Sequence, residues 1–216
     1  AIAAIQYTGG TTGLSKGAVL THANLLSNIT QTLSHLGDAN GEGCETFVTP
    51  LPLYHIYAFV LSLMVFSKGN ANTLIPNPRD LDGFVNTLTH ITPTGFCGIN
   101  TLFVGLSSHP QINQVDFSKL KLTLSGGAAL TSFAYELWLK LTGCQISEGY
   151  GLSETSPVVC LNRPGREQIG TIGTPVLDTE IQIWNDDGKP VVPGEAGEIV
   201  VRGPQVMQGY WKQPQE

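Results

Sequence analysis

Charged residues are scarce in this chain, and so are several other features that define protein classes. Only 13% of the residues are charged, about half of the usual share of ~25%. The eleven Lys and Arg residues are scattered, and the net charge is −6. Nucleic-acid-binding proteins carry a basic patch or stripe. The sequence therefore predicts that nucleic acid is not a partner.

Long apolar runs and paired cysteines are missing as well. The longest apolar stretch, Tyr57 to Phe66, is interrupted by Ser62, whereas a membrane-spanning helix needs about 20 apolar residues. The four cysteines have no C-x-x-C spacing. We therefore expect no transmembrane segment, and we expect buried thiols of a reducing compartment in place of a zinc site or a disulfide framework.

Glycine, by contrast, is abundant. The chain holds 25 glycines in 216 residues, and the average share is about 7%. Glycine loses more conformational freedom on folding than other residues, so such an excess needs a reason. Hydrophobic residues make up 41% of the chain, which suffices for the core of one large or two small domains.

Residues 44 to 149 show the alternation of an α/β fold. A helix is indicated where five apolar residues fall on one face after Asp80, which is placed to cap it, and Phe133, Leu137 and Leu141 form a similar stripe. Short apolar runs precede and follow these helical patterns. We expect a mainly parallel sheet with helices on both faces, its strands near 46–49, 73–75, 95–98, 120–124 and 145–148.

The pattern changes after about residue 165. Glu180–Trp184 alternates polar and apolar residues, and Glu198–Arg202 reads as a second strand. Asp187-Gly188 and Pro193-Gly194 indicate turns between them. We therefore divide the chain into an α/β subdomain at 1–165 and the beginning of a β-rich subdomain at 166–216. Because the sequence opens without Met and stops without a closing element, we expect it to be a piece of a longer protein.

A Gly- and Thr-rich segment stands near the start of the chain. The residues from Thr8 to Gly13 are all Gly or Thr, and Lys16 follows. Backbone N–H groups and hydroxyls in such a segment can bind a phosphate, and a flexible turn between two strands is the alternative. The segment is not a Walker A loop, because Ser15 stands where that motif requires Gly.

Two further motifs each admit two interpretations. His55 follows a strand end and precedes the most apolar helical segment, so it is either a ligand-binding residue at the edge of the sheet or a histidine that starts a helix. Ser125–Ala128 ends a strand in small residues. These either let a planar ligand approach the backbone or form a tight turn into the next helix.

The segment Ser147 to Thr155 holds a third candidate group. Gly149-Tyr150-Gly151 begins like the dinucleotide-binding motif G-x-G-x-x-G, but Glu154 stands at the third glycine. Residues 151 to 155 resemble the G-x-S-x-G nucleophile elbow of hydrolases, but Thr155 stands at the last glycine. What remains is an aromatic ring at Tyr150, a hydroxyl at Ser153 and a carboxylate at Glu154. Such groups can stack a base, bind a phosphate and hold Mg²⁺. The alternative for Glu154 is a solvated surface acid.

The order of these motifs along the chain resembles the adenylate-forming acyl-CoA synthetases, and most of all the bacterial long-chain-fatty-acid–CoA ligases. The resemblance implies an ATP-dependent acid–thiol ligase. A fatty acid and Mg·ATP would give acyl-adenylate and pyrophosphate, and coenzyme A would then displace AMP. The matching segments are Tyr7–Gly17, Leu51–Ile56, Gly98–Phe103, Ser125–Ala128, Glu148–Glu154 and Gly203–Trp211.

The resemblance also implies roles for individual residues. Lys16, His55 and Glu154 would be catalytic, with Glu154 binding Mg²⁺ and His55 near the substrate carboxylate. Gly98 would border the acyl channel. Ser153 stands where the family usually has Thr, and Ser15 where it usually has Pro. The nucleotide would be held by Thr8, Gly9, Gly10, Thr11, Thr12, Gly13, Gly126, Gly127, Ala128, Gly149, Tyr150, Gly151 and Ser153.

The same resemblance also bears on where the protein acts and on what the 216-residue chain can do alone. It implies a cytoplasmic protein, with peripheral contact at the cytoplasmic face of the inner membrane as an alternative, and it leaves the oligomeric state open. The family's ribose-binding Asp, domain hinge and adenylation Lys lie beyond Trp211, so we expect the 216-residue chain alone to be inactive. Three other interpretations stay open. They are a ligase for another acid or a carrier-protein acceptor, a nucleotide-binding module, and a hydrolase that uses Ser153.

Overall fold

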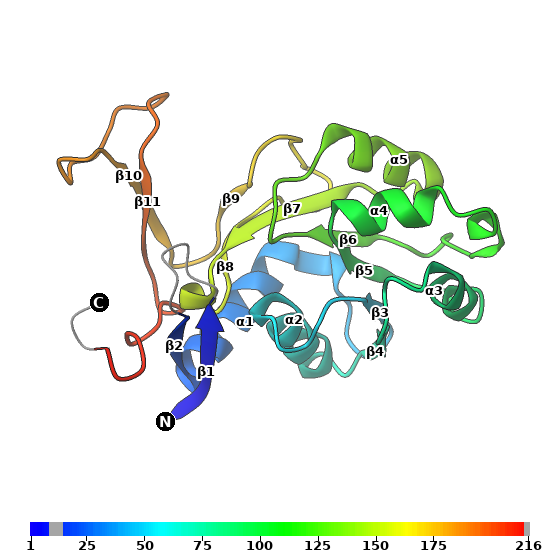
Figure 1. Cartoon of the computed structure of the whole chain (residues 1–216), viewed down its shortest axis with the longest axis horizontal. Helices are drawn as coiled ribbons and strands as arrows, with labels where there is room; N and C mark the ends of the chain where they lie inside the picture. The colour runs from blue at the N-terminus through cyan, green and yellow to red at the C-terminus, as the bar shows by residue number, and fades with distance from the viewer. Residues whose placement is uncertain (9–14, 214–216) are drawn as a thin grey trace.

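The computed structural model describes residues 1–8 and 15–213 and is built on a seven-stranded sheet (Figure 1). The strand order is β4-β3-β5-β6-β7-β8-β9; the strands from β3 to β7 are parallel, and β8 and β9 are antiparallel additions at one edge. The predicted α/β class is confirmed. The strands are β3 (Thr46–Thr49), β4 (Ala71–Leu74), β5 (Gly95–Gly98), β6 (Leu122–Ser125), β7 (Ile146–Gly151), β8 (Val158–Leu161) and β9 (Thr174–Pro175).

Helices cover both faces of this sheet. One face carries α1 (His22–Leu36) and α2 (Ile56–Ser67), and the other carries α3 (Leu81–Leu88), α4 (Asn100–Ser107) and α5 (Ser132–Thr142) (Figure 1). Each face has its own cluster of buried apolar side chains. Among the described residues no helix combines the length and the apolar character needed to cross a membrane. Short 3₁₀ turns lie at η1 (Gly37–Ala39), η2 (Ile112–Gln114) and η3 (Ser153–Thr155).

Two antiparallel hairpins flank the sheet. β1 (Ile2–Thr8) pairs with β2 (Lys16–Thr21), and β10 (Glu180–Trp184) pairs with β11 (Glu198–Arg202), as the alternating pattern of these last two strands predicted. Figure 1 shows β10 and β11 projecting away from the helices. The subdomain boundary at residue 165 stays a prediction, and β9 extends the main sheet past that residue.

The helix after Asp80 forms as predicted and is shorter than its apolar pattern. The Asp80 carboxylate accepts a hydrogen bond from the Gly83 backbone N–H at 3.0 Å and caps the helix. The helix ends at Leu88, before Ile91. Pro93 disfavours helical backbone in the residue before it, so the chain must leave the helix here. Ile91 still packs against the apolar cluster from its turn.

The predicted stripe of α5 is wrong at Phe133, whereas Leu141 packs against the apolar cluster as predicted. Phe133 is 63% exposed, and the buried residues of this helix are Ala134, Tyr135 and Trp138. The Trp138 ring is fully buried 4.8 Å from the Phe96 ring centroid, and its indole N–H donates to Thr123 Oγ1 at 3.0 Å. Burying the largest aromatic ring with its one donor satisfied outweighs burying Phe133.

The four cysteines are free thiols, and three of them are buried as predicted. Cys44 is the exception, because it lies exposed in the segment before β3. Burial raises the pKa of the Cys97 thiol, and it raises the pKa of the Cys160 thiol to about 11. These thiols are protonated at neutral pH, and a metal ligand or a nucleophile would need the thiolate.

Candidate functional site

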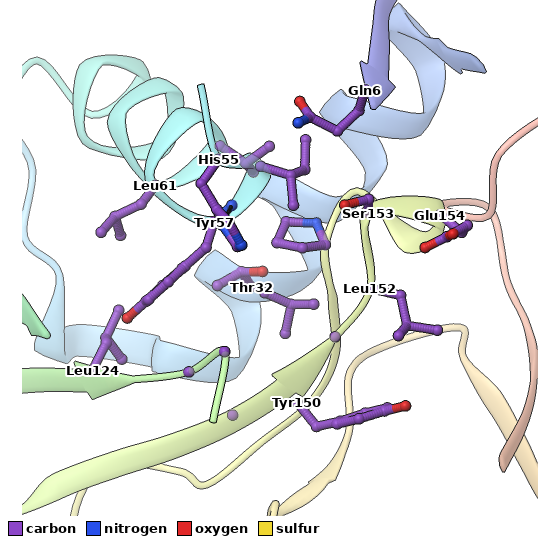
Figure 2. A pocket seen from close by; sticks show the side chains of 18 of the residues that line it. Gln6, Thr32, His55, Tyr57, Leu61, Leu124, Tyr150, Leu152, Ser153 and Glu154 are labelled. Atoms are coloured by element: carbon purple, nitrogen blue, oxygen red, sulfur yellow. Dashed lines mark hydrogen bonds between the residues drawn. The ribbon is translucent and has the colours of Figure 1, made fainter. Parts of the chain in front are cut away.

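A cavity of about 780 Å³ opens at the carboxyl ends of β6 and β7, between the sheet and helices α1 and α2 (Figure 2). Ligands of open α/β sheets bind at this edge of the strands. The structure brings most of the predicted site residues together here. Those that line the cavity are Thr8, His55, Gly126, Gly127, Gly149, Tyr150, Gly151, Ser153 and Glu154.

Two of these glycines are required by the fold itself. Gly127 has φ +85°, which side chains with a Cβ rarely adopt. A Cβ on Gly151 would collide with the backbone of Pro157, where β7 lies against the segment that enters β8. The pairing of β7 with β8 thus accounts for Gly151 without any ligand, and this reason was not foreseen from the sequence.

The loop after β6 is fastened by two side chains that sequence analysis had not singled out. The buried Glu148 carboxylate accepts a hydrogen bond from the Leu130 N–H at 2.8 Å. Asn100, at the start of α4, donates to the Ala129 carbonyl at 2.7 Å and accepts from the Thr131 N–H at 2.8 Å. These bonds hold Gly126 and Gly127 at the cavity. Ala128 lines an adjoining cavity of about 350 Å³ that also has His55 and Gly126 in its wall.

His55 both starts a helix and lines the cavities, which are the two interpretations that the sequence left open. It is the N-cap of α2, where its Nδ1 accepts a hydrogen bond from the Tyr57 N–H at 3.2 Å. It also lines both cavities. Figure 2 shows its side chain at the start of α2, beside Tyr57. With Nδ1 occupied by the cap, Nε2 is the ring atom left to face a ligand.

Glu154 and Lys16 are linked through one tyrosine. The Tyr210 hydroxyl donates to Glu154 Oε1 at 2.7 Å, and Lys16 Nζ lies 5.3 Å from the centre of the Tyr210 ring. The Met207 N–H donates to the Glu154 carbonyl at 2.8 Å, and the Trp211 N–H donates to the Gly17 carbonyl at 2.7 Å. Residues far apart in the sequence therefore meet at Glu154. The Gly203–Trp211 motif was the only sequence signal for this tyrosine.

Of the predicted phosphate-binding segment, the structure describes Thr8 at one end and Ser15 and Lys16 at the other. The Ser15 hydroxyl donates to the Thr8 carbonyl at 2.7 Å, and Thr8 lines the cavity, whereas Lys16 is not part of its wall. The remaining predicted residues of the segment lie outside the described residues, and their role stays a prediction. They are Gly9, Gly10, Thr11, Thr12 and Gly13.

Gly98 lies at the end of β5. It lines neither of the two cavities, and a Cβ there would meet the Phe103 ring at 2.9 Å and the Phe96 ring at 3.3 Å. The space beside this glycine is therefore filled by the aromatic side chains of the core. The role of Gly98 at an acyl channel therefore stays a prediction, and neither of these two cavities supports it.

The deep part of the cavity is apolar and comes from helices whose role the sequence did not reveal. Ile29 on α1 and Leu61 and Met64 on α2 face Leu124 at the end of β6 and Leu161 on β8. Thr32 and Tyr57 also line the cavity, and their hydroxyl oxygens are buried. Helix α1 itself was missed, because its buried face is largely polar. The cavity thus joins a polar mouth to an apolar interior.

The described residues contain no group of three His, Cys, Asp or Glu side chains that could hold a metal ion. A cation with dedicated protein ligands therefore does not fit them. Mg²⁺ is usually bound by one or two carboxylates together with substrate phosphates. Glu154, at the wall of the cavity, could supply one such carboxylate.

Comparison with known proteins agrees with this arrangement. The family model described as "AMP-binding enzyme" matches residues 1–211. A long-chain-fatty-acid–CoA ligase of Salmonella typhimurium is 46% identical over 215 residues, which cover 99% of this chain and 38% of that protein. The chain thus spans well under half the length of this curated relative.

Solved structures show the same fold. ATP-bound MatB from Rhodopseudomonas palustris superposes with a TM-score of 0.87 at 29% identity, over 99% of this chain and 42% of that one. A long-chain-fatty-acid–CoA ligase from Archaeoglobus fulgidus gives a TM-score of 0.86 at 28% identity, over 99% of this chain and 44% of that one.

Proposed function

Because the chain belongs to the family of AMP-binding enzymes, we propose that the intact protein is an ATP-dependent long-chain-fatty-acid–CoA ligase. The fatty acid carboxylate attacks the α-phosphorus of ATP, and pyrophosphate leaves. The thiol of coenzyme A, after losing its proton, then attacks the acyl carbonyl, and AMP leaves with its electron pair. The carrying observation is a cavity of about 780 Å³ whose glycine-rich mouth continues into an apolar interior.

The mouth of the cavity suits a nucleotide. In this proposal the Tyr150 ring stacks on the adenine, and the backbone of Gly126 to Ala128 lies along its edge. Ser153 donates a hydrogen bond to the α-phosphate. Each of these residues lines one of the two adjoining cavities. Gly149 and Gly151 keep the floor of the mouth free of side chains.

Charge that develops on the phosphates is met by residues around Tyr210. Lys16 and the segment from Thr8 to Gly13 bind the β- and γ-phosphates, and Glu154 holds Mg²⁺, which neutralises phosphate charge when bound. Tyr210 fixes the Glu154 carboxylate and the Lys16 ammonium relative to each other, since it contacts both. His55 orients the substrate carboxylate through Nε2.

Coenzyme A is the acceptor in this proposal. A cytoplasmic location with peripheral membrane contact suits a lipid substrate.

Fatty-acid-dependent exchange between ATP and pyrophosphate tests the first step in the intact protein. We expect Glu154→Ala to lower exchange by about 100-fold or more, because it removes the carboxylate that would hold Mg²⁺. We expect Lys16→Ala to lower exchange by about 10-fold, because it removes a positive charge that would face the phosphates. Glu136→Ala, at an exposed position on α5, is the matched control and should exchange like the parent. Unchanged exchange in Glu154→Ala would contradict the magnesium role, and no exchange with any fatty acid would reject the ligase.

A further inference from the structure

Residues 207–211 run antiparallel beside β2 and fasten two parts of the site through their backbone. The Val19 N–H donates to the Gly209 carbonyl at 3.0 Å, which joins the segment to β2. The Met207 N–H donates to the Glu154 carbonyl at 2.8 Å, which joins it to the turn η3. Backbone hydrogen bonds therefore already hold the segment, the strand and the turn together.

The Tyr210 side chain adds two contacts to this backbone scaffold. Its hydroxyl donates to Glu154 Oε1 at 2.7 Å, and its ring centre lies 5.3 Å from Lys16 Nζ. The short distance is typical of a hydrogen bond to an ionised group, which is about twice as strong as a neutral one. Because the Glu154 backbone is held separately, this bond fixes the direction of the carboxylate and is not needed to hold the turn.

The neighbouring residue Trp211 provides a comparison within the same segment. Its ring lies 5.8 Å from Lys212 Nζ, so it also contacts a cation, but both residues are exposed at the surface. The Tyr210 ring instead contacts Lys16, the lysine that follows the predicted phosphate-binding residues. Its hydroxyl reaches Glu154, which lines the cavity. Tyr210 is therefore the aromatic residue of this segment whose contacts lead to the site.

We propose that Tyr210 is a positioning residue whose hydroxyl and ring have two separable effects on the binding of ATP. The hydroxyl holds the Glu154 carboxylate in the orientation that binds Mg²⁺ together with the phosphates. Replacing a residue that orients a metal ligand typically lowers metal affinity about 10- to 100-fold. The ring restrains the Lys16 ammonium, so the lysine side chain loses less freedom when phosphate binds. The inference rests on the proposed function, because it concerns the site where that function places Mg·ATP.

The test measures ATP binding to the intact protein by isothermal titration calorimetry, without a fatty acid, so that no adenylate can form. Each variant is titrated once with excess Mg²⁺ and once with EDTA. The ratio of the two dissociation constants, EDTA over Mg²⁺, gives the contribution of the cation. The constant in EDTA reports the contacts that need no cation, including that of Lys16 with the phosphates. A parent protein that binds ATP equally well in both conditions would overturn the inference.

Two replacements of Tyr210 separate its hydroxyl from its ring. Tyr210→Phe keeps the ring and should lower the ratio about 10-fold, while the constant in EDTA stays close to that of the parent. Tyr210→Leu removes both groups and should also raise the constant in EDTA about 2- to 5-fold, the range of an exposed cation–π contact. An unchanged ratio in Tyr210→Phe would overturn the role of the hydroxyl. Equal constants in EDTA for the two variants would overturn the role of the ring.

Matched substitutions control for the loss of a hydroxyl or a ring as such. Tyr135→Phe, on α5 and away from both cavities, removes a hydroxyl that accepts from Gln145 Nε2 at 3.1 Å. Trp211→Leu removes the exposed ring that contacts Lys212. Both variants should bind ATP like the parent in Mg²⁺ and in EDTA. A fall in the ratio for Tyr135→Phe as large as that for Tyr210→Phe would overturn the inference.

A double variant tests whether the hydroxyl acts through Glu154. Glu154→Gln removes the charge that would hold Mg²⁺, so adding Tyr210→Phe to it should lower the ratio no further. A second loss of about 10-fold in the double variant would overturn the inference. So would a Tyr210→Phe protein that loses unfolding free energy and keeps the ratio of the parent, because that is the result expected of a purely structural hydrogen bond.

The outcomes also separate this inference from the proposed function. If the ratio falls as expected and no acid supports exchange between ATP and pyrophosphate, the ligase proposal fails while the role of Tyr210 stands. If palmitate supports exchange and Tyr210→Phe keeps the ratio of the parent, the role of Tyr210 fails while the ligase proposal stands.

Discussion

The two faces of the seven-stranded sheet are built from different chemistry. On the face that carries α3 to α5, every buried helical residue is apolar or aromatic, and the rings of Phe96, Phe103 and Trp138 pack within about 5 to 6 Å of one another. On the other face, α1 buries asparagine, glutamine, threonine and histidine, and a cavity opens beside it. One face is filled and supports the sheet, while the other leaves room for a ligand.

The largest expected effect compares the same substitution on both faces. Leu106→Ala, at a fully buried position of the filled face, should lower the free energy of unfolding by about 4–5 kcal/mol. Leu61→Ala, which enlarges a cavity that already exists, should cost only about 2–3 kcal/mol. Equilibrium urea unfolding measures both. Equal losses would show that the two faces are packed alike.

The second prediction concerns the polar side chains that hold α1 to the sheet. Asn28 is fully buried, donates to the Val158 carbonyl at 2.8 Å and accepts from the Val158 N–H at 3.0 Å. Asn28→Ala leaves both backbone groups unpaired and should cost about 2–4 kcal/mol in the same unfolding experiment. Thr30→Ala, on the exposed side of α1, should change stability by no more than about 0.5 kcal/mol. A similar small change for Asn28→Ala would show that apolar packing alone holds this helix.

A smaller effect is expected where α3 begins on the filled face. Asp80→Ala removes the cap of this helix and should lower the unfolding free energy by about 1 kcal/mol. Asp80→Asn keeps an oxygen that can accept from the Gly83 N–H and should cost only a few tenths of that amount. If both variants lose the same amount, the charge at the helix start matters and the cap does not.

The smallest expected effect is a pH dependence on the hollow face. Burial of His35 lowers its pKa from 6.5, Arg163 adds to this, and the hydrogen bond to the Leu161 carbonyl partly opposes it. The unfolded chain therefore binds this proton more readily, so the contribution of His35 to stability is present above pH 6.5 and declines as the pH falls below it. When the pH is lowered from above 6.5 to below it, the free energy of unfolding of the parent should fall more than that of His35→Gln, as measured by urea unfolding. Equal losses would contradict the prediction.

Local sequence patterns predicted those elements whose cause is local. The runs at 46–49, 95–98, 180–184 and 198–202 form strands with these bounds, and Asp80 caps its helix. The stripe of α5 was wrong at Phe133 because two faces of that helix are apolar enough to be buried, and the partners Phe96 and Thr123 favour the face with Trp138. Helix α1 was missed because its buried side chains find polar partners in distant segments.

The candidate site divides in the same way. Its mouth was predictable, because Gly126, Gly127, Tyr150 and Glu154 sit in short motifs whose spacing is visible in the chain. The apolar interior was not. Thr32 and Met64 belong to two different helices, and nothing in the spacing of either helix says that they face one space.

The sequence by itself therefore determined the α/β alternation, the family and the residues that can meet a nucleotide, because these depend on short-range pattern and on residue type. Only the tertiary structure decided that Tyr210 joins Lys16 to Glu154, that Gly98 faces aromatic rings, and that residues of α1 and α2 line one cavity with Leu124 and Leu161. The reason is physical. Such contacts join residues many positions apart, and their geometry is set by how the sheet and its helices pack.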